Sequence, residues 1–390
     1  MTDFLPNAGI SKLLGVAGVI AAALLVYAYA GYPLLLSILS LFSRRRRPEI
    51  GYTPSISVLI SAYNEEAVIG RKIEQTLALE YPADKLEVLV VSDGSTDRTD
   101  EIVRTFSDPR VRLLRVEGRA GKTVAQNEGV KRCRGEIIVF SDATAIYHPK
   151  ALLYLAANYA DPRVGAVSGR YKYFDPEDES PTGSGSVAFW NYENIIKFFQ
   201  SRISTLTGCS GCIYSVRRSA YIPLPREACS DLVEPLWIVR AGRRVAFEDR
   251  ALAYEETTKT SSQEFKMRVR VATRGMRGLL SAPELLAPWR HPWIAFQLFS
   301  HKIVRWLVPV FLIIILAATI ANLNSVVFQA AFALQALFYC AAVTSLYVPL
   351  HRRWKLLGIP LFFCTLNAAA LIGMFAVFRG HKFTTWETVR

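Results

Sequence analysis

Cysteine and histidine are scarce in this chain, which contains six cysteines and five histidines among 390 residues. The closest pair, Cys209 and Cys212, has the CxxC spacing of zinc and redox sites, but no second pair and no histidine lies beside it. This pattern argues against a zinc site or a redox centre. We expect reduced thiols, as in the cytosol or the interior of a membrane.

Acidic residues are outnumbered, with 33 Asp and Glu against 46 Lys and Arg, which gives a formal net charge of +13. A basic protein can bind nucleic acid, but the sequence lacks a zinc finger, an RNP sequence or another such motif. Much of the positive charge instead lies beside long apolar segments, where anionic lipid headgroups would meet it. We therefore expect membrane lipids, and not nucleic acid, as partners.

Charge is absent from Leu13–Ser43, a run of 31 residues. A membrane-crossing helix needs about 20 apolar residues, so this run is long enough for one crossing with a short extension. It is too long for the core of a signal peptide, and the basic run Arg44–Arg47 follows it in place of a cleavage site. Because basic residues stay on the inner side, the following domain is predicted to be cytoplasmic, at a bacterial inner membrane.

Three more apolar stretches near the carboxyl end have the length of a membrane crossing. They are Ile303–Leu323, Val326–Leu350 and Leu356–Phe378. The basic segment His351–Trp354 is expected to be a cytoplasmic loop. Four crossings would leave the basic tail 379–390 outside, so either this tail is an exception or one stretch does not cross fully.

Between the apolar ends, short apolar runs alternate with helical patterns from Ser55 to Asp142. The predicted strands are Ser57–Ala62, Leu86–Val91, Val111–Val116 and Glu136–Phe140. The predicted helices run from Asn64 to about Leu79, from Thr99 to Phe106 and from Lys122 to Cys133. This alternation predicts βαβ units and an α/β fold with a mostly parallel sheet. Ligands of such sheets bind at the carboxyl ends of the strands.

Polar side chains follow the first two predicted strands directly. Asn64 and Glu65 come after the first strand, and they also suit the first turn of a helix. Asp93 follows the second strand, beside Gly94. A carboxylate in this position can hydrogen-bond a nucleobase or a ribose, so all three are candidate ligand-binding residues.

The third helix and the fourth strand add further candidates. The segment Gly118–Thr123 imitates a phosphate-binding P-loop, but Val116 stands where GxxxxGK[ST] requires glycine, which argues against an ATPase. Lys122 and Asn127 remain candidates because their helix begins at the same sheet edge. Asp142 follows the fourth strand and could hold Mg²⁺ or Mn²⁺, with Thr144 as a poorer second ligand.

In this order and spacing, the motifs resemble the nucleotide-sugar domain of the inverting family 2 glycosyltransferases. This family includes the membrane-embedded synthases of cellulose, chitin, hyaluronan and poly-N-acetylglucosamine. The likeness extends from Ser55 to about Leu280. It implies a Rossmann-like GT-A domain flanked by transmembrane helices, a nucleotide-diphosphate sugar as donor (a UDP-sugar first of all) and a polysaccharide or a lipid-linked acceptor.

The resemblance also implies a role for individual residues. Asp231, which follows Ser230 at the start of an apolar helix, resembles the family's general base, and a base there would take the proton of the acceptor hydroxyl. Asp142 resembles the first aspartate of the DxD metal motif. Arg274 is the nearest match to the arginine of QxxRW. The nucleotide-sugar site would comprise Asn64, Glu65, Asp93, Lys122, Asn127, Asp142 and Arg274, and the glycine-rich acceptor side would comprise Gly208 and Gly211.

The sequence departs from the family pattern at several positions. Ser92, Thr144 and Ser230 stand where many members have an acidic residue, and the Gln and Trp of QxxRW are absent around Arg274. Metal dependence and processive synthesis therefore stay open. The leading hypothesis is an inner-membrane transferase that uses Asp231 in a single inverting displacement. The alternatives are a processive synthase that translocates its product and a pseudo-transferase that serves as a membrane scaffold.

The chain is divided accordingly into five parts. Residues 1–47 form the first membrane helix, 48–280 the catalytic domain, 281–305 an interfacial segment, 306–380 the carboxy-terminal membrane helices and 381–390 a tail. The basic segment Lys266–Arg277 is expected to lie on the inner leaflet. His301 is expected to be a membrane anchor, and the aromatic residues Phe189 and Trp190 are expected in a core or against lipid.

Overall fold

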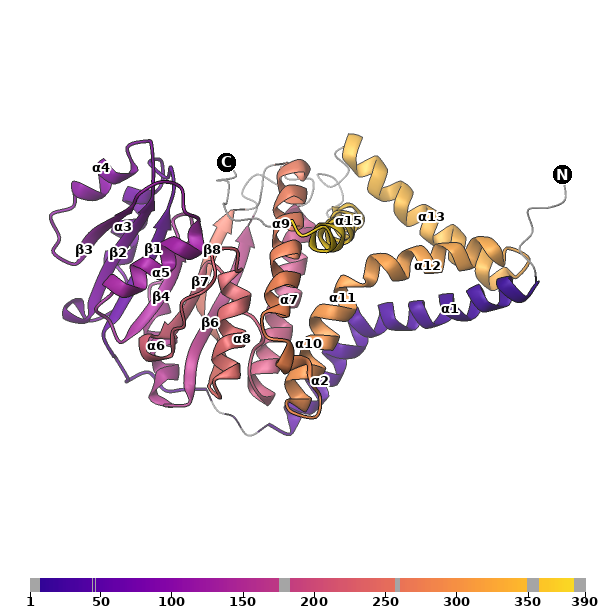
Figure 1. The fold of residues 1–390 in the computed structure, drawn as a ribbon, viewed down its shortest axis with the longest axis horizontal. Coiled ribbons are helices and arrows are strands. Elements are labelled where there is room, and N and C mark those ends of the chain that lie inside the picture. Colours follow the sequence, from indigo (N-terminus) through magenta and orange to yellow (C-terminus); the bar gives the residue numbers. More distant parts are fainter. Residues whose placement is uncertain are drawn as a thin grey trace.

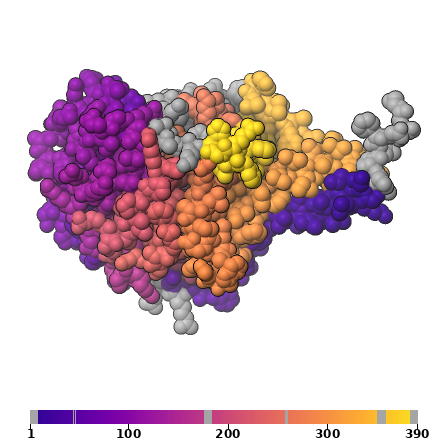
Figure 2. All heavy atoms as spheres, viewed as in Figure 1, coloured from indigo at the N-terminus to yellow at the C-terminus, as the bar shows by residue number. Residues whose placement is uncertain are grey.

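The computed structural model describes residues 8–43, 45, 47–174, 183–256, 260–348 and 358–381. Figure 1 shows an α/β domain on one side and a group of long helices on the other. In Figure 2 the first helix (indigo) and the orange helices near the carboxyl end project from the rounded domain as an arm, whereas the last helix (yellow) lies against the domain.

One sheet of eight strands forms the centre of the domain, in the order β3-β2-β1-β4-β7-β6-β8-β5. The strands are β1 Ile56–Ala62, β2 Leu86–Asp93, β3 Val111–Val116, β4 Ile137–Asp142, β5 Ile146–Tyr147, β6 Val164–Phe174, β7 Ile213–Arg217 and β8 Arg244–Glu256. The pairs β1–β2, β1–β4, β2–β3 and β6–β8 are parallel, and the other three are antiparallel. The predicted α/β fold with a mostly parallel sheet is confirmed.

Helices cover both faces of this sheet. They are α3 Ile69–Leu77, α4 Thr99–Arg104, α5 Lys122–Arg132, α6 Ala151–Ala157, α7 Gly183–Ile203, α8 Ser230–Arg240 and α9 Ser261–Leu280. Because successive side chains of a strand point to opposite faces, β1 contributes Val58 and Ile60 to a core with α3 and α6, and Leu59 to a core with α5. All seven residues of β1 are buried, as expected for a strand covered on both faces.

The first helix of the domain starts later than predicted. The sequence pattern placed its start near Asn64, but α3 begins at Ile69. The intervening residues form a turn in which Asn64 has a φ of 53°, a left-handed conformation that Asn tolerates better than most residues. The strand edge is therefore followed by an irregular loop, whose backbone N–H groups at Asn64, Glu65 and Glu66 donate hydrogen bonds to side chains of the segment after β2.

The helices outside the domain are long and apolar. They are α1 Ala8–Val26, α2 Tyr32–Leu41, α10 Pro292–Leu298, α11 Val304–Trp306, α12 Val308–Ala321, α13 Val326–Tyr347 and α15 Gly358–Phe378. The π-helical turn Tyr27–Gly31 joins α1 to α2, so that Gly9–Leu41 forms one helical stretch of 33 residues.

Within the described part of the chain, three helices are long and apolar enough to cross a membrane, by length and composition. A fourth candidate is the pair Pro292–Trp306 and Val308–Ala321, which is bent by 54° and is either a broken span or a re-entrant loop. The awkward parity of the predicted crossings therefore coincides with one irregular segment. The predicted loop His351–Trp354 and most of the tail lie outside the described residues.

Helices α1 and α12 lie side by side (Figure 1). A Cβ atom at Gly18 would be 2.4 Å from the Cβ of Ala318, so only glycine permits this contact. At the end of the pair far from the sheet, the Ser11 hydroxyl donates a hydrogen bond to the Ala321 carbonyl oxygen at 2.6 Å. The start of α1 and the end of α12 are thus at the same end of the molecule.

The long helices are attached to the domain through polar contacts and packing. Arg45 donates a hydrogen bond to the Ser201 carbonyl oxygen at 2.9 Å, and Arg47 forms an ion pair with Asp249 at 2.7 Å. Helix α15 packs along α9 and α7 (Figure 1). Part of the predicted basic run therefore contacts the catalytic domain directly.

Candidate functional site

A cleft of about 360 Å³ lies beyond the carboxyl ends of β1 and β4, and we call it the sheet-edge cleft. It brings together six of the residues that the sequence singled out. These are Glu65, Lys122, Asp142, Gly211, Asp231 and Arg274. Loops after parallel strands, the start of α5, the start of α8 and one face of α9 converge here, so residues 65 to 274 build one site.

Asp142, the last residue of β4, stands in a cluster of charged and polar groups. The Lys122 ammonium contacts its Oδ1 atom. Burial alone would lower the pKa of Lys122, but the negative charge of Asp142 raises it above its ordinary value. Asp142 thus keeps Lys122 charged inside the cleft.

Glu255, near the end of β8, is a site residue that the sequence analysis missed. The Thr144 hydroxyl donates a hydrogen bond to Glu255 Oε1 at 2.7 Å, and the Tyr171 hydroxyl donates one to Oε2. Burial, and after it the charge of Asp142, raises the pKa of Glu255. The sequence does show two consecutive glutamates, Glu255 and Glu256, at the end of a strand. Only the pairing of β8 with β6 and β5, however, brings Glu255 beside Asp142.

The cluster fits partial ligation of a hard divalent cation. No group of three or more His, Cys, Asp or Glu side chains that could hold a metal ion occurs among the described residues. Mg²⁺ is commonly held by one or two carboxylates together with the phosphates of a substrate. Asp142 and Glu255 could supply those carboxylates and Thr144 a hydroxyl oxygen, so the donor set suits a cation that arrives with a diphosphate.

Asp231 lies in the first turn of α8, where the helix dipole favours its negative charge. The Cys229 thiol donates a hydrogen bond to its Oδ1 atom at 2.9 Å. Its Oδ2 atom lies 3.1 Å from the point where a Cβ atom at position 211 would be, so Gly211 leaves room for the carboxylate. Asp231 is therefore exposed to the cleft with one oxygen unobstructed by a side chain from the facing loop.

Arg274 of α9 lines the cleft and also binds the chain around it. Its guanidinium donates hydrogen bonds to the Ala228 carbonyl oxygen and, at 3.3 Å, to the Thr123 hydroxyl. Arg270, one helical turn earlier, lines the same cleft. Met267–Val271 has an arginine at the position that QxxRW requires, again without Gln and Trp, so two registers of this motif fit the sequence equally.

Two of the predicted site residues shape loops and do not line the cleft. Asp93 is fully buried, and its two carboxylate oxygens accept hydrogen bonds from the backbone N–H groups of Ala120 and Gly121, both at 2.9 Å. It thereby fixes the loop that ends at Lys122. Asn127 donates a hydrogen bond to the Leu224 carbonyl oxygen at 2.8 Å and accepts one from the Tyr221 hydroxyl at 2.6 Å.

Asn64 also has a structural contact. Its side-chain oxygen accepts a hydrogen bond from the Thr96 backbone N–H at 2.8 Å, which ties the loop after β1 to the loop after β2. The adjacent Glu65 is buried and lines the cleft. This bridge keeps the two strand ends in a fixed relation beside the cluster.

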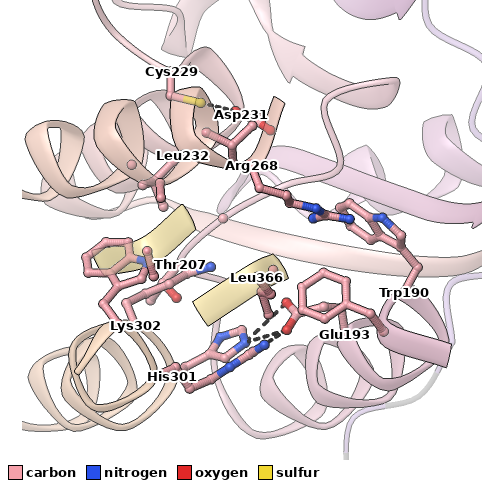
Figure 3. Close-up of a pocket in the computed structure, with 18 of the residues that line it drawn as sticks. Trp190, Glu193, Thr207, Cys229, Asp231, Leu232, Arg268, His301, Lys302 and Leu366 are labelled. Atoms are coloured by element: carbon pink, nitrogen blue, oxygen red, sulfur yellow. Dashed lines mark hydrogen bonds and ion pairs between the residues drawn. The ribbon is translucent and has the colours of Figure 1, made fainter. Parts of the chain in front are cut away.

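A second cavity, of about 200 Å³, lies on the other side of Asp231, between the domain and the long helices; we call it the membrane-side chamber. It is lined by the loop around Gly208, by α7, α8 and α9, and by Tyr29 and Leu366 of the long helices. Figure 3 shows Asp231 at one end of the chamber and Glu193 with His301 at the other. Asp231 and Trp190 line both cavities.

One expectation about this region is wrong. His301 is not a membrane anchor, because it is 3% exposed and its Nε2 atom lies 3.2 Å from Glu193 Oε2. Arg305 contacts the same glutamate. Trp190 packs against the main core of the domain, as expected, and also lines the chamber with Phe189. In the basic segment of α9, Arg268 is buried and forms an ion pair with Glu264 at 2.8 Å, and the placement of the other charges on the inner leaflet stays a prediction.

Residues 57–224 match the family model of glycosyl transferase family 2. Among curated relatives, a probable glycosyltransferase YdaM of Bacillus subtilis is 29% identical over 239 residues, which cover 56% of this chain and 54% of the relative. A poly-beta-1,6-N-acetyl-D-glucosamine synthase of Staphylococcus epidermidis is 28% identical over 235 residues, which cover 58% of this chain and 55% of the relative.

These matches span little more than half the length of each relative. A solved structure is similar over nearly the whole chain: a mannosyltransferase from Pyrobaculum calidifontis, in complex with GDP-Man and Mn²⁺. It has a TM-score of 0.68 and 24% identity, and the similarity covers 93% of this chain and 99% of the other. This likeness establishes the shared fold.

Proposed function

The chain carries a family 2 glycosyltransferase domain over residues 57–224, and we propose that it transfers a sugar from a nucleotide-diphosphate sugar to an acceptor at a membrane surface. The observation that carries the proposal is the position of Asp231. Its carboxylate lines both the sheet-edge cleft and the membrane-side chamber, so groups bound in the two cavities meet at this side chain.

The chemistry is a single inverting displacement. An oxygen of the acceptor hydroxyl attacks the anomeric carbon of the donor and forms the new glycosidic bond. Asp231 takes the proton of that hydroxyl, and the bond from the anomeric carbon to the diphosphate breaks with its electron pair on the diphosphate. A positioned general base of this kind contributes about 10²- to 10⁴-fold to a rate.

The leaving diphosphate gains negative charge, and cationic groups of the cleft offset it. Lys122 at the start of α5 and the arginines of α9, Arg270 and Arg274, supply fixed positive charge there. A divalent cation held by Asp142 and Glu255 would add charge stabilisation at the same point. The Mn²⁺ bound to the similar mannosyltransferase supports the use of a cation.

We propose a UDP-sugar as donor, with GDP-mannose as the first alternative because the similar solved structure contains it. A polysaccharide or a lipid-linked molecule is the proposed acceptor. The catalytic domain, residues 48–280, is placed in this proposal on the cytoplasmic side of a bacterial inner membrane. The first helix, the interfacial segment 281–305 and the helices of 306–380 would hold it there.

A second candidate function is processive synthesis with translocation of the product. The staphylococcal relatives named as poly-beta-1,6-N-acetyl-D-glucosamine synthases favour it. The length of the product separates this function from a single addition: a ladder of oligomers indicates processive synthesis, and one product mass indicates single transfer.

The decisive experiment measures nucleoside-diphosphate release by the detergent-purified chain. UDP- and GDP-sugars are supplied in turn, each with Mg²⁺, Mn²⁺ or EDTA. We expect release with one donor, and we expect Asp231→Asn to reduce it about 10²- to 10⁴-fold while donor binding persists, because the base is lost and the cleft is not. The exposed Asp84→Asn is the matched control, with unchanged release.

Two results would contradict the proposal. Donor binding to neither UDP- nor GDP-sugars in calorimetry would exclude a transferase and favour the scaffold role. Equal release by Asp231→Asn and the wild type would leave the transferase in place but remove Asp231 as its base.

A further inference from the structure

The membrane-side chamber has a charge pattern that the proposed transfer reaction does not require. Four cationic side chains line it, against two carboxylates. The cations are Lys197, Arg268, Lys302 and Arg305, and the carboxylates are Glu193 and Asp231. Arg268 is paired with Glu264, and Arg305 with Glu193. Within the part of the chain that the structure describes, Lys197 and Lys302 therefore have no carboxylate in contact.

Lys302 faces the chamber beside the loop that contains Gly208. Its ammonium lies 3.9 Å from the point where a Cβ atom at Gly208 would be. Among the residues that the structure describes, Lys302 makes no hydrogen bond and no ion pair. Figure 3 shows it on the chamber wall near Thr207. A lysine that lines a cavity and has no counter-charge in contact within the described part of the chain is a candidate site for an anion.

Lys197 reaches the same cavity from α7. It is 5% exposed, and its ammonium donates a hydrogen bond to the neutral Ser210 hydroxyl at 2.8 Å. Burial lowers the pKa of Lys197, whereas a nearby anion would raise it. The Thr207 hydroxyl is 1% exposed, lines the chamber and has no hydrogen-bond partner in the described part of the chain. Lys197 of α7 and Thr207 of the loop after α7 thus offer polar groups to a ligand in the chamber.

Part of the remaining wall is apolar and comes from the long helices. Tyr29 belongs to the turn between α1 and α2, Trp306 to α11, and Leu366 and Ala370 to α15. A soluble anion would gain nothing from these groups, whereas the part of a lipid next to its headgroup would remove their surface from water. The chamber is also smaller than the usual 300–1,000 Å³ of ligand pockets, so it suits a headgroup and not an entire oligosaccharide.

We propose that the acceptor of this enzyme is an anionic lipid whose phosphate or carboxylate group binds between Lys197 and Lys302, with its hydroxyl directed at Asp231. The inference rests on the proposed transferase function and specifies the class of its acceptor. Glu193, which is paired with Arg305, lies at the end of the chamber opposite Asp231 (Figure 3).

The test measures lipid binding to the purified full chain by tryptophan fluorescence, because Trp190 and Trp306 line the chamber. The probes are dioctanoyl phosphatidylglycerol, dioctanoyl phosphatidylcholine and glycerol 3-phosphate. We expect the anionic lipid to bind at least about tenfold more tightly than the other two, because only it offers both a net negative charge and acyl chains. This comparison needs no variant.

Variants then assign the charge. Lys302→Gln should weaken binding of the anionic lipid about tenfold, since one charge-assisted hydrogen bond is lost, and Lys302→Arg should retain most of the affinity. The matched control is Lys266→Gln, an exposed lysine of α9 that lines neither cavity. It should bind the lipid as the wild type does.

Three outcomes overturn the inference. They are equal affinity for the two lipids, affinity for glycerol 3-phosphate equal to that for the anionic lipid, and Lys302→Gln binding equal to Lys266→Gln. Nucleoside-diphosphate release measured on the same preparations separates the two proposals. Release without preference for the anionic lipid rejects only the acceptor class. Preference for this lipid without donor binding rejects only the transferase.

Discussion

Gly211 and Asp231 face each other so closely that a larger residue at position 211 would displace the carboxylate. A Cβ atom at position 211 would come within 3.1 Å of Asp231 Oδ2. That contact is a few tenths of an ångström too short, and the short Asp231 side chain would have to move. The glycine thus sets the position of the proposed base.

We expect Gly211→Ala to lower kcat about tenfold with little change in thermal stability, because small displacements of a reacting group are costly in rate. Steady-state kinetics and a melting curve measure the two effects. Gly51→Ala, where an added Cβ atom meets nothing within 4 Å, is the control. An unchanged kcat in Gly211→Ala would show that the carboxylate position does not limit the reaction.

Thr144 stands at the position of the second acid of the DxD motif, and we expect the carboxylate of Glu255, which is hydrogen-bonded to Thr144, to take the role of that acid. We expect Glu255→Gln to weaken Mn²⁺ binding about 10- to 100-fold in the presence of a nucleoside diphosphate, because both Thr144 and the cation would lose their charged partner. Calorimetry with Mn²⁺ measures it. The exposed neighbour Glu256, on the opposite face of the strand, provides the control Glu256→Gln. Equal affinities in the two variants would remove Glu255 from the site.

Gly211, Asp231 and Arg274 were found through the family resemblance, and without it the predictable site residues are those at the ends of strands and the starts of helices that meet at one sheet edge. Asp142 and Lys122 lie in the cleft because β4 and α5 both end or begin at the carboxyl edge of the sheet. Asp93 follows a strand in the same way, yet two backbone N–H groups bind its carboxylate inside the protein. Glu255 reaches the cleft through strand pairing between distant segments, which no local pattern encodes.

At the scale of elements, α8 carries a second acidic residue with an unusual environment. Glu234 is 1% exposed, and only its Oε2 atom accepts a hydrogen bond, from the Tyr214 hydroxyl at 3.1 Å. Burial raises the pKa of Glu234 to about 8, despite the opposing effect of Tyr214. Folded protein therefore holds this side chain neutral at pH 7, although the unfolded chain ionises it.

The raised pKa makes stability depend on pH. The contribution of Glu234 is fully present below the unfolded pKa of about 4.5 and is lost as the pH rises to about 8. Gln does not titrate, so we expect the melting temperature of Glu234→Gln minus that of the wild type to increase from pH 5 to pH 8. Above pH 8 this difference should stay constant. Melting curves from pH 5 to 9 measure this, with the exposed Glu128→Gln as control. A difference independent of pH would contradict the assignment.

Elements with strong apolar periodicity were predicted well, and irregular ones were not. The starts of β2, β3 and α5 agree with the sequence pattern to the residue, because uninterrupted apolar runs and helix starts have local causes. The start of α3 was placed five residues early, since the polar residues after β1 suit a helix turn but are held by the loop after β2. The bend of 54° before α12 has no local signal beyond Pro309 and Arg305.

At the scale of the whole molecule, α1 and α12 run in opposite directions beside each other. Ser11 and Asn322 exchange hydrogen bonds at the end far from the sheet. The loop after α12 is therefore at the opposite end from the catalytic domain, although the helix leading into it is bent. This argues that α12 reaches the far side of the membrane.

We expect a cysteine introduced at Asn324 to react with an impermeant maleimide from the side of the membrane opposite to the domain, because α12 ends beside the start of α1. Labelling of intact cells and of inverted vesicles measures it, in a chain carrying Cys340→Ser to remove an exposed thiol. Ala83→Cys, on the exposed edge of the domain, is the control and should react from the other side only. Reaction of both positions from one side would make the bent pair a re-entrant loop.

The arrangement of the two cavities around Asp231 has a kinetic consequence. In the proposed reaction, the donor reaches the Asp231 carboxylate from water and the lipid acceptor reaches it from the plane of the bilayer. The rate should then follow the mole fraction of the acceptor among the lipids, and not its amount per volume of solution. Adding inert lipid or detergent at constant acceptor would slow the enzyme by surface dilution, while the dependence on the donor would stay unchanged.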